Sequence, residues 1–373
     1  MENRKNIISK LKKVVIKVGT RLLTDESRIA VLVKNIAEIR KKGIDVLLVS
    51  SGAVGVGMKQ LEIKNRPGKL AEVQALASVG QGRLIQMYND ECMKYGFHAA
   101  QVLLTANDLR ERERHLNVLN CLNSLCSRNI LPIINENDVV SVDELKFGDN
   151  DFLAALVATM TQADMTIILT TESGLRNKVD GKLTDRISEV AEITEEMKKS
   201  ASGTDNSDFS IGGMISKLKA AEIVCPSGEY LWIADGRTDD TLEKIFKAED
   251  IGTLFLPTTK NHMQGRKRWI RFFSPKRGRI VVDEGAEQAL IAGGKSLLPS
   301  GIAFVEGSFQ RGDTVEICNR FSKSLGRGLI NYTSEECGKI AGCQMTEVSK
   351  LLQQCTDDVI IHRDNMVIDK AVN

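Results

Sequence analysis

Short apolar runs alternate with longer segments of helical periodicity from Val14 to Pro257. Each run is five or six residues long and most are rich in β-branched side chains. Apolar runs of this length are typical of strands that a sheet buries on both faces. We therefore predict strands at Val14–Val18, Asp45–Val49, Ala99–Leu104, Ile130–Ile134, Met165–Leu169 and Tyr230–Ala234.

The segments between these strands predict helices. Between Ile29 and Ile39, apolar residues recur at three- and four-residue spacings and so line one face of a helix. Because parallel strands require long crossover connections, strands that alternate with helices predict an α/β fold with a mainly parallel sheet sandwiched by helices. Further helices are predicted at Leu70–Lys94, Arg114–Arg128, Phe152–Gln162 and Met214–Val224.

The pattern changes after Lys260. The stretch from Lys260 to Arg279 contains eight lysine and arginine residues, no acidic residue and three interleaved aromatic residues. Beyond it, short strands separated by glycine turns predict a small β-rich module. These strands are predicted at Gly278–Val282, Gly301–Gly307, Asp313–Cys318, Gly326–Ile330 and Val359–His362. The predicted organisation is a catalytic domain at residues 1–259, a basic linker at 260–277, the β-rich module at 278–356 and a C-terminal tail at 357–373.

The composition is that of an ordinary globular protein, with 42% hydrophobic and 27% charged residues among 373. A formal net charge of +2 gives no general reason to expect binding to nucleic acid or to a membrane. The N-terminal segment lacks the apolar run of a signal peptide, so we predict a cytoplasmic protein. Eight cysteines without a C-x-x-C pair and four separated histidines predict reduced thiols and no metal site.

Polar and glycine-rich segments follow four of the predicted strands. They begin at Gly19, Ser50, Asn135 and Thr170. Because the carboxyl ends of parallel strands meet at one edge of a sheet, we expect these segments to form a ligand site there.

Two lysines beside glycine turns indicate an anion site. Lys17 lies inside an apolar strand just before Gly19, and a buried ammonium group is very unfavourable without a partner. Lys217 follows the turn Gly212-Gly213, whose backbone N–H groups suit a phosphate. The alternatives are that Lys17 reaches solvent from the strand and that Lys217 lies on an exposed helix face. The pair together favours a phosphate-handling enzyme, although the chain has no Walker A motif.

The segment Gly52–Gly57 resembles a nucleotide-binding loop, but it matches neither G-x-G-x-x-G nor a P-loop. It is either a strand-to-helix turn or an anion site in which Ser51 and the following N–H groups bind at a helix N-terminus. We interpret Gly294-Lys295-Ser296 as a surface loop, because no buried strand precedes it.

Carboxylate and amide side chains form two clusters on either side of a hairpin predicted at residues 140–146. One cluster ends at Asp138, and the other opens a helix at Asn150-Asp151. A helix cap alone would explain one residue of the second cluster but not the whole set. Asp138 and Asn150 suit the ammonium group of a substrate, and Asp151 would hold the two lysines in position.

A series of short motifs runs along nearly the whole chain. They are Val15–Thr20, Val49–Ala53, Gln74–Gln81, Ile134–Asp138, Phe147–Asp151, Gly212–Lys217, Arg266–Ile270, Val282–Ala286, Ser296–Pro299 and Ile361–Asp364. In this order they resemble the amino acid kinase family, in particular its members that act on glutamate and carry a C-terminal PUA domain.

The resemblance implies an amino acid kinase fold followed by a PUA domain. It implies transfer of the ATP γ-phosphoryl group, with Mg²⁺ carried by ATP, to the side-chain carboxylate of L-glutamate in the first step of proline biosynthesis. It also implies a homo-oligomer, either dimer or tetramer, and L-proline as a feedback inhibitor.

The resemblance also assigns roles to individual residues. It implies that the catalytic residues are Lys17, Lys217 and Asp151, and that glutamate is bound by Ser51, Asp138 and Asn150. The implied ATP-binding residues are Lys17, Thr170, Thr171, Ile211, Gly212, Gly213, Met214, Ile215, Ser216 and Lys217.

Three positions near the implied nucleotide site depart from the family pattern. Thr171 stands where the family has Asp, Arg176 where it commonly has Tyr, and Ile211 where it has Thr. One alternative is a related kinase that acts on another carboxylate, on carbamate or on a nucleoside monophosphate. A second is an RNA-binding protein, against which the small net charge and the lack of an RNP1 signature argue.

Overall fold

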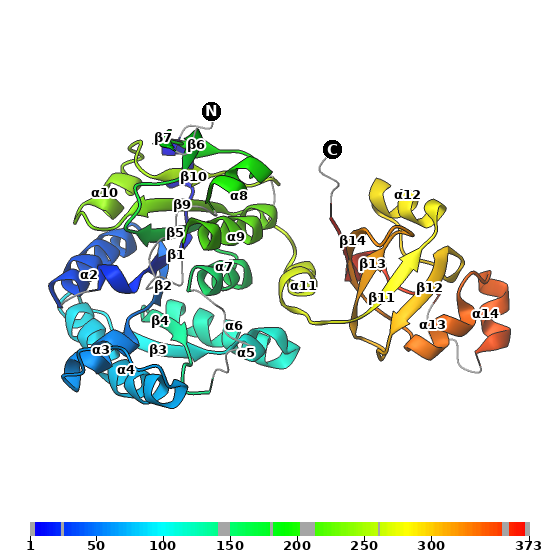
Figure 1. Ribbon diagram of the computed structural model, residues 1–373, viewed down its shortest axis with the longest axis horizontal. Coiled ribbons are helices and arrows are strands. Elements are labelled where there is room, and N and C mark those ends of the chain that lie inside the picture. The colour runs from blue at the N-terminus through cyan, green and yellow to red at the C-terminus, as the bar shows by residue number, and fades with distance from the viewer. Residues whose placement is uncertain are drawn as a thin grey trace. The chain divides into compact units, whose positions relative to one another are not determined.

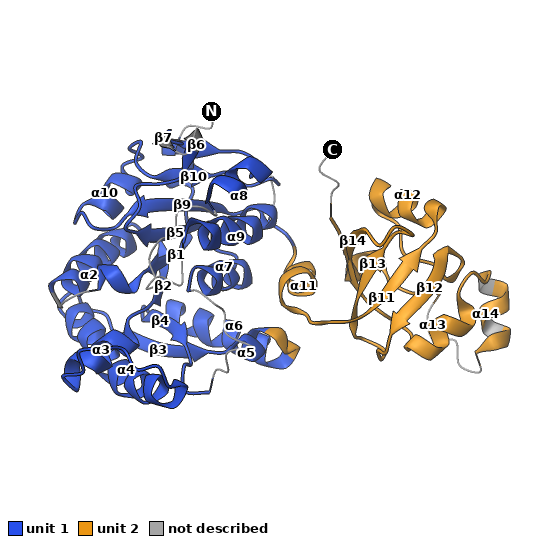
Figure 2. Cartoon of the chain, viewed as in Figure 1, with its two compact units in different colours: residues 1–109, 113–263 blue, residues 110–112, 264–373 orange. Residues whose placement is uncertain are grey.

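The computed structural model describes residues 4–23, 26–140, 150–179, 182–201, 213–259, 262–352 and 358–369. The chain forms two compact units (Figure 1, Figure 2). Unit 1 comprises residues 1–109 and 113–263, and unit 2 comprises residues 110–112 and 264–373. All but the first residue of the hairpin predicted at 140–146 lies outside the described residues.

Within the described residues, unit 1 is built on an eight-stranded sheet in the order β3-β4-β2-β1-β5-β9-β10-β8. The central strand β1 (Lys13–Val18) pairs in parallel with β2 (Asp45–Ser50) and β5 (Met165–Thr170). The other strands are β3 (Ala99–Leu104), β4 (Leu131–Glu136), β8 (Glu189–Val190), β9 (Tyr230–Asp235) and β10 (Thr253–Phe255), with a separate hairpin of β6 (Arg176–Val179) and β7 (Lys182–Arg186). The six predicted strands and the mainly parallel sheet are confirmed, and β10 is antiparallel to β9.

Helices cover both faces of this sheet (Figure 1). Helices α2 (Glu26–Lys41) and α10 (Thr241–Phe246) pack on one face, and α7 (Asn150–Thr161) and α9 (Met214–Val224) pack on the other. The remaining helices are α1 (Arg4–Ser9), α3 (Ala53–Gln60), α4 (Leu70–Met93), α5 (Ala106–Arg110), α6 (Arg112–Ser127) and α8 (Glu195–Ala201). The predicted helices all form: α2 extends beyond the apolar stripe from Ile29 to Ile39, and the ends of α4, α6, α7 and α9 differ by at most two residues from the prediction.

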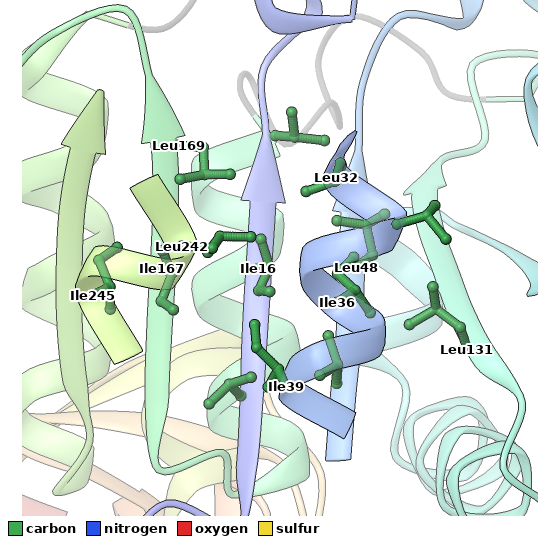
Figure 3. Close-up of a cluster of buried hydrophobic side chains, with 14 of the residues drawn as sticks. Ile16, Leu32, Ile36, Ile39, Leu48, Leu131, Ile167, Leu169, Leu242 and Ile245 are labelled. Carbon is green, nitrogen blue, oxygen red and sulfur yellow. The ribbon is translucent and has the colours of Figure 1, made fainter. Parts of the chain in front are cut away.

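The apolar stripe of α2 packs onto the sheet and forms much of its core. Figure 3 shows Leu32, Ile36 and Ile39 of α2 beside Ile16 of β1 and Leu48 of β2. All five side chains are buried, which explains the spacing of apolar residues in this helix. A buried leucine or isoleucine contributes about 1.5–3 kcal/mol, so this stripe is a main source of stability for unit 1.

Unit 2 contains, within its described residues, a five-stranded sheet in the order β12-β11-β13-β14-β15. Its strands are β11 (Lys276–Val282), β12 (Ile302–Gly307), β13 (Thr314–Cys318), β14 (Ser324–Leu329) and β15 (Met366–Ile368). Its helices are α11 (Gly265–Arg268), α12 (Glu284–Ala292), α13 (Ser334–Ile340) and α14 (Met345–Leu351). The sheet has its own hydrophobic core, which includes the buried rings of Phe309 and Tyr332.

The segment predicted as a linker is folded. Residues 265–273 form α11 and a π-helix (Trp269–Phe273), and β11 already begins at Lys276. The side chains of Trp269, Ile270 and Phe273 are buried. Two of the three aromatic residues of the basic stretch, Trp269 and Phe273, are therefore buried. The compact unit 2 includes this stretch and begins at residue 264.

The C-terminal end differs from the prediction in a second way. The predicted strand Val359–His362 provides only an isolated bridge between Ile361 and Leu297. The segment predicted as a tail instead supplies β15, which pairs antiparallel with β14. A strand of three residues is too short for a periodicity signal, and it forms only because β14 offers a free edge.

Two glycines bring α3 and α4 into close contact. A Cβ atom on Gly57 would lie 2.0 Å from the carbonyl oxygen of Leu76, and one on Gly80 would lie 1.8 Å from that of Ala53. The segment Gly52–Gly57 thus enters α3, and Gly57 is required by helix packing.

We expect Gly80→Ala to destabilise the protein by about 1–3 kcal/mol, because the added methyl group would push α3 away from α4. Gly82→Ala is the matched control, since Gly82 lies in the same helix and its Cβ would meet nothing within 4 Å. In Gly82→Ala the free energy of unfolding should be unchanged or higher by up to about 1 kcal/mol. Urea unfolding measures both, and equal stability of the two variants would contradict the packing role.

Candidate active site

The carboxyl ends of β1, β2, β4 and β5 lie at one edge of the sheet of unit 1, because these strands are parallel. Lys17 lies near the end of β1, between Val49 of β2 and Ile168 of β5. Helix α7 packs against β1 and β5, and α9 packs against α7. Asp151 in the first turn of α7 therefore reaches Lys17, and Lys217 in the first turn of α9 reaches Asp151.

Asp151, in the first turn of α7, binds two lysines. Its Oδ1 lies 2.6 Å from Nζ of Lys17 and its Oδ2 lies 2.9 Å from Nζ of Lys217. The hydroxyl group of Ser216 donates to the same Oδ2 at 3.0 Å. Asp151 is fully buried, and Lys17 and Lys217 are only 6% and 3% exposed. Neither lysine lies on a solvent-facing surface, so the structure excludes the two alternatives for them.

The lysine–aspartate cluster (Lys17, Asp151 and Lys217) contains an ionised carboxylate. Burial alone would raise the pKa of Asp151, but the charges and hydrogen bonds of Lys17 and Lys217 outweigh it and hold the pKa well below its ordinary value. Asp151 is therefore ionised at neutral pH. Within the cluster one carboxylate faces two ammonium groups. Buried ammonium groups attract an anion more strongly than exposed ones.

Asn150, the first residue of α7, joins the ends of two strands. Its Nδ2 atom lies 2.6 Å from Oγ of Ser51, 2.9 Å from the carbonyl oxygen of Ser50 and 3.0 Å from Oδ1 of Asn135. The side chain therefore does more than cap its helix. An amide nitrogen has two hydrogens, so it cannot satisfy three acceptors at once. At any moment one of the three is able to accept from another donor, such as a substrate ammonium group.

The other predicted substrate residue lies close to the same edge. Asp138 is half-buried in the turn after β4, and the neighbouring carbonyl of Val139 accepts a hydrogen bond from Nε2 of Gln74 at 3.2 Å. On the other side of β1, Thr170 is the last residue of β5 and Thr171 follows it.

The predicted nucleotide segment 211–217 is described only in part. Gly213 is the N-cap of α9, and the helix begins with Met214, Ile215, Ser216 and Lys217. Ile211 and Gly212 lie outside the described residues.

Sequence reasoning selected Asp138 from its cluster and missed Asn135. Asn135 is 5% exposed, and its Oδ1 accepts from the backbone N–H of Glu136 as well as from Asn150. A signal was present, because an amide that directly follows a buried apolar run needs hydrogen-bond partners.

Among the described residues, no group of three or more histidine, cysteine, aspartate or glutamate side chains has a geometry suited to a metal ion. In the same part of the chain, every helix is too short or too polar to cross a bilayer.

Comparison with known proteins gives two family matches. Residues 12–235 match the amino acid kinase family and residues 278–352 match the PUA domain. The chain is 45% identical over 365 residues to a glutamate 5-kinase of Thermoanaerobacter sp. (strain X514), covering 95% of this chain and 97% of that protein. It is 42% identical over 376 residues to a glutamate 5-kinase of Desulfotalea psychrophila, covering 99% and 100%. Among solved structures, a carbamate kinase from Giardia lamblia bound to AMP-PNP aligns with a TM-score of 0.47 and 17% identity, covering 66% of this chain and 99% of that one.

We expect Asp151→Asn to lower the free energy of unfolding at neutral pH by about 3–5 kcal/mol, because two buried ammonium groups would lose their carboxylate. The contribution of Asp151 is fully present above its unfolded-state pKa of about 3.9 and is lost as the pH falls toward its lowered native pKa. Urea unfolding should therefore show the difference between wild type and variant shrinking below about pH 4.

The control for this prediction is Glu243→Gln, which breaks an exposed ion pair with Lys247. Exposed pairs contribute little, so this variant should retain the stability of the wild type at neutral pH. A stability loss in Asp151→Asn no larger than that of the control would show that Asp151 does not hold the two lysines.

Proposed function

Because the chain belongs to the amino acid kinase family, and within it to the glutamate 5-kinases, we propose that it phosphorylates the side-chain carboxylate of L-glutamate with ATP. The products are L-glutamyl 5-phosphate and ADP, and the reaction is the first step of proline biosynthesis. The observation that carries the proposal is the lysine–aspartate cluster at the ligand-facing edge of the sheet.

The chemistry of the reaction agrees with the residues of the cluster. A glutamate side chain has a pKa of about 4.3, so at neutral pH it attacks as a carboxylate and needs no general base. A carboxylate oxygen forms a bond to the γ-phosphorus, and the bond between that phosphorus and the β–γ bridging oxygen breaks to release ADP. The enzyme then has to align two anions and offset their charge.

Each member of the cluster has a distinct role in this proposal. The ammonium groups of Lys17 and Lys217 offset charge on the transferring phosphoryl group. Asp151 holds both groups close together, since each of its oxygens is paired with one of them. Mg²⁺ enters bound to the ATP phosphates and supplies further positive charge there.

Glutamate would bind beside the cluster, at the ends of β2 and β4. Ser51, Asp138 and Asn150 offer a hydroxyl, a carboxylate and an amide, which suit the ammonium and carboxylate groups of an amino acid. The nucleotide would lie on the other side, along Thr170, Thr171 and the segment 211–217. By membership of the family, we further propose a cytoplasmic homo-oligomer that L-proline inhibits.

The activity is tested by trapping the acyl phosphate with hydroxylamine in the presence of ATP and Mg²⁺. We expect hydroxamate to form with L-glutamate and little to form with aspartate or N-acetylglutamate. With UMP or carbamate as the acceptor, the release of ADP from ATP should stay at background level. Faster turnover of any of these four acceptors than of L-glutamate would assign the chain to a related kinase instead.

We expect Lys217→Ala to lower kcat by at least about 100-fold, the usual effect of removing a group that stabilises transition-state charge. The KM for glutamate should change only modestly, because the ammonium group of Lys217 acts on the phosphoryl group. Lys219→Ala is the matched control, since Lys219 lies in the same helix and is exposed. Steady-state kinetics measure both variants. A kcat of Lys217→Ala equal to that of the control would contradict the role of Lys217 in phosphoryl transfer.

A further inference from the structure

A buried tyrosine contacts the strand end that carries Ser51. Tyr88 lies in α4, is fully buried, and its hydroxyl oxygen is 2.9 Å from Oγ of Ser50. Ser50 is the last residue of β2 and is itself fully buried. The Tyr88 hydroxyl has no direct role in the reaction proposed above, because it is buried and hydrogen-bonded to Ser50.

Ser50 connects Tyr88 to the backbone of Ser51. Oγ of Ser50 shares a hydrogen bond with the hydroxyl group of Tyr88, and either hydroxyl can be the donor. When the Ser50 hydroxyl donates to the carbonyl oxygen of Ser51 at 3.2 Å, Tyr88 is the donor to Ser50. A chain of hydrogen bonds therefore runs from Tyr88 through Ser50 to the backbone of Ser51.

The same two serines are held from the opposite side by Asn150. Its amide donates to the carbonyl oxygen of Ser50 and to the hydroxyl of Ser51. The backbone at the end of β2 is thus fixed between a helix on each side, α4 through Tyr88 and α7 through Asn150.

Helix α4 is a firm support for this contact. Gly57 and Gly80 bring α3 and α4 together without room for a Cβ atom, so α4 cannot shift freely along α3. The ring of Tyr88 lies within the hydrophobic core of unit 1, where close packing restricts its rotation.

We propose that Tyr88 is a positioning residue for the glutamate acceptor: through Ser50 it sets the orientation in which the Ser51 hydroxyl meets the substrate. This inference rests on the proposed function, in which Ser51 binds glutamate. Tyr88 itself touches neither glutamate nor ATP. Its removal would leave the phosphate end of the site intact and loosen only the acceptor end.

The test is Tyr88→Phe, which keeps the ring and removes only the hydroxyl. We expect the KM for glutamate to rise between about two- and tenfold, the effect of one neutral hydrogen bond, with the KM for ATP and kcat unchanged. KM does not depend on the fraction of active enzyme, so partial loss of folded protein does not obscure the result. An unchanged KM for glutamate, or an equal rise in both KM values, would overturn the inference.

Tyr332→Phe is the control for a purely structural effect. Tyr332 is a fully buried tyrosine of unit 2, so this variant removes a buried hydroxyl far along the chain from the proposed site residues. We expect its KM for glutamate to match the wild type even where thermal unfolding shows lower stability. A rise in KM equal to that of Tyr88→Phe would assign both effects to stability and overturn the inference.

A double-mutant cycle tests whether Tyr88 acts through Ser50. If it does, Ser50→Ala raises the KM for glutamate, and adding Tyr88→Phe raises it no further. If the two substitutions raised the KM for glutamate independently, so that their effects multiplied in the double variant, Tyr88 would not act through Ser50.

Ser51→Ala separates this inference from the function on which it rests. A raised KM for glutamate in Ser51→Ala together with a normal KM in Tyr88→Phe would refute the role of Tyr88 alone. A normal KM in Ser51→Ala would refute the placement of glutamate at Ser51, and with it the inference.

Discussion

The contact on which the rest of the site depends is the ion pairing of one buried carboxylate with two ammonium groups. Lys17 and Lys217 come from elements some 200 positions apart in the sequence, and each would be strongly unfavourable in the interior alone. Asp151 makes their burial tolerable by pairing with both. The arrangement is weak evidence for stability, because a buried ion pair often only offsets its own desolvation. Its value is functional, since it keeps two cations close together in a site of low dielectric constant.

The parallel sheet provides the geometry for this cluster. Since β1, β2, β4 and β5 end at the same edge, the polar residues that follow these strands lie close together. The strand order alone brings them there, without long loops. Helix α7 then runs from that edge across the sheet, and its buried face leaves little freedom of rotation. The acceptor side and the phosphate side of the proposed site are therefore parts of one rigid layer, which fits a reaction that needs alignment more than acid–base chemistry.

Much of this was predictable from sequence, and the exceptions have physical causes. Continuous apolar runs identify the strands buried on both faces, and an unexplained lysine in such a run identifies Lys17. The packing role of Gly57 was not predictable, because it depends on the distance between two helices. Strand β15 was missed because its three residues form a strand only beside β14. The stretch around Trp269 was predicted as a linker from its charge, but it forms α11 and a π-helix whose Trp269 and Phe273 are buried.

The first two residues of α7 set the spacing between the two halves of the site. Asn150 and Asp151 are neighbours in the chain, so the trans peptide bond between them holds their Cα atoms about 3.8 Å apart. In a helix their side chains diverge by about 100°, which lets one reach β2 and β4 while the other reaches β1 and α9. A single peptide unit thus fixes the distance between the two halves of the site. Thermal movement of the helix would carry both anchors together, and no insertion or deletion at this point would preserve their spacing.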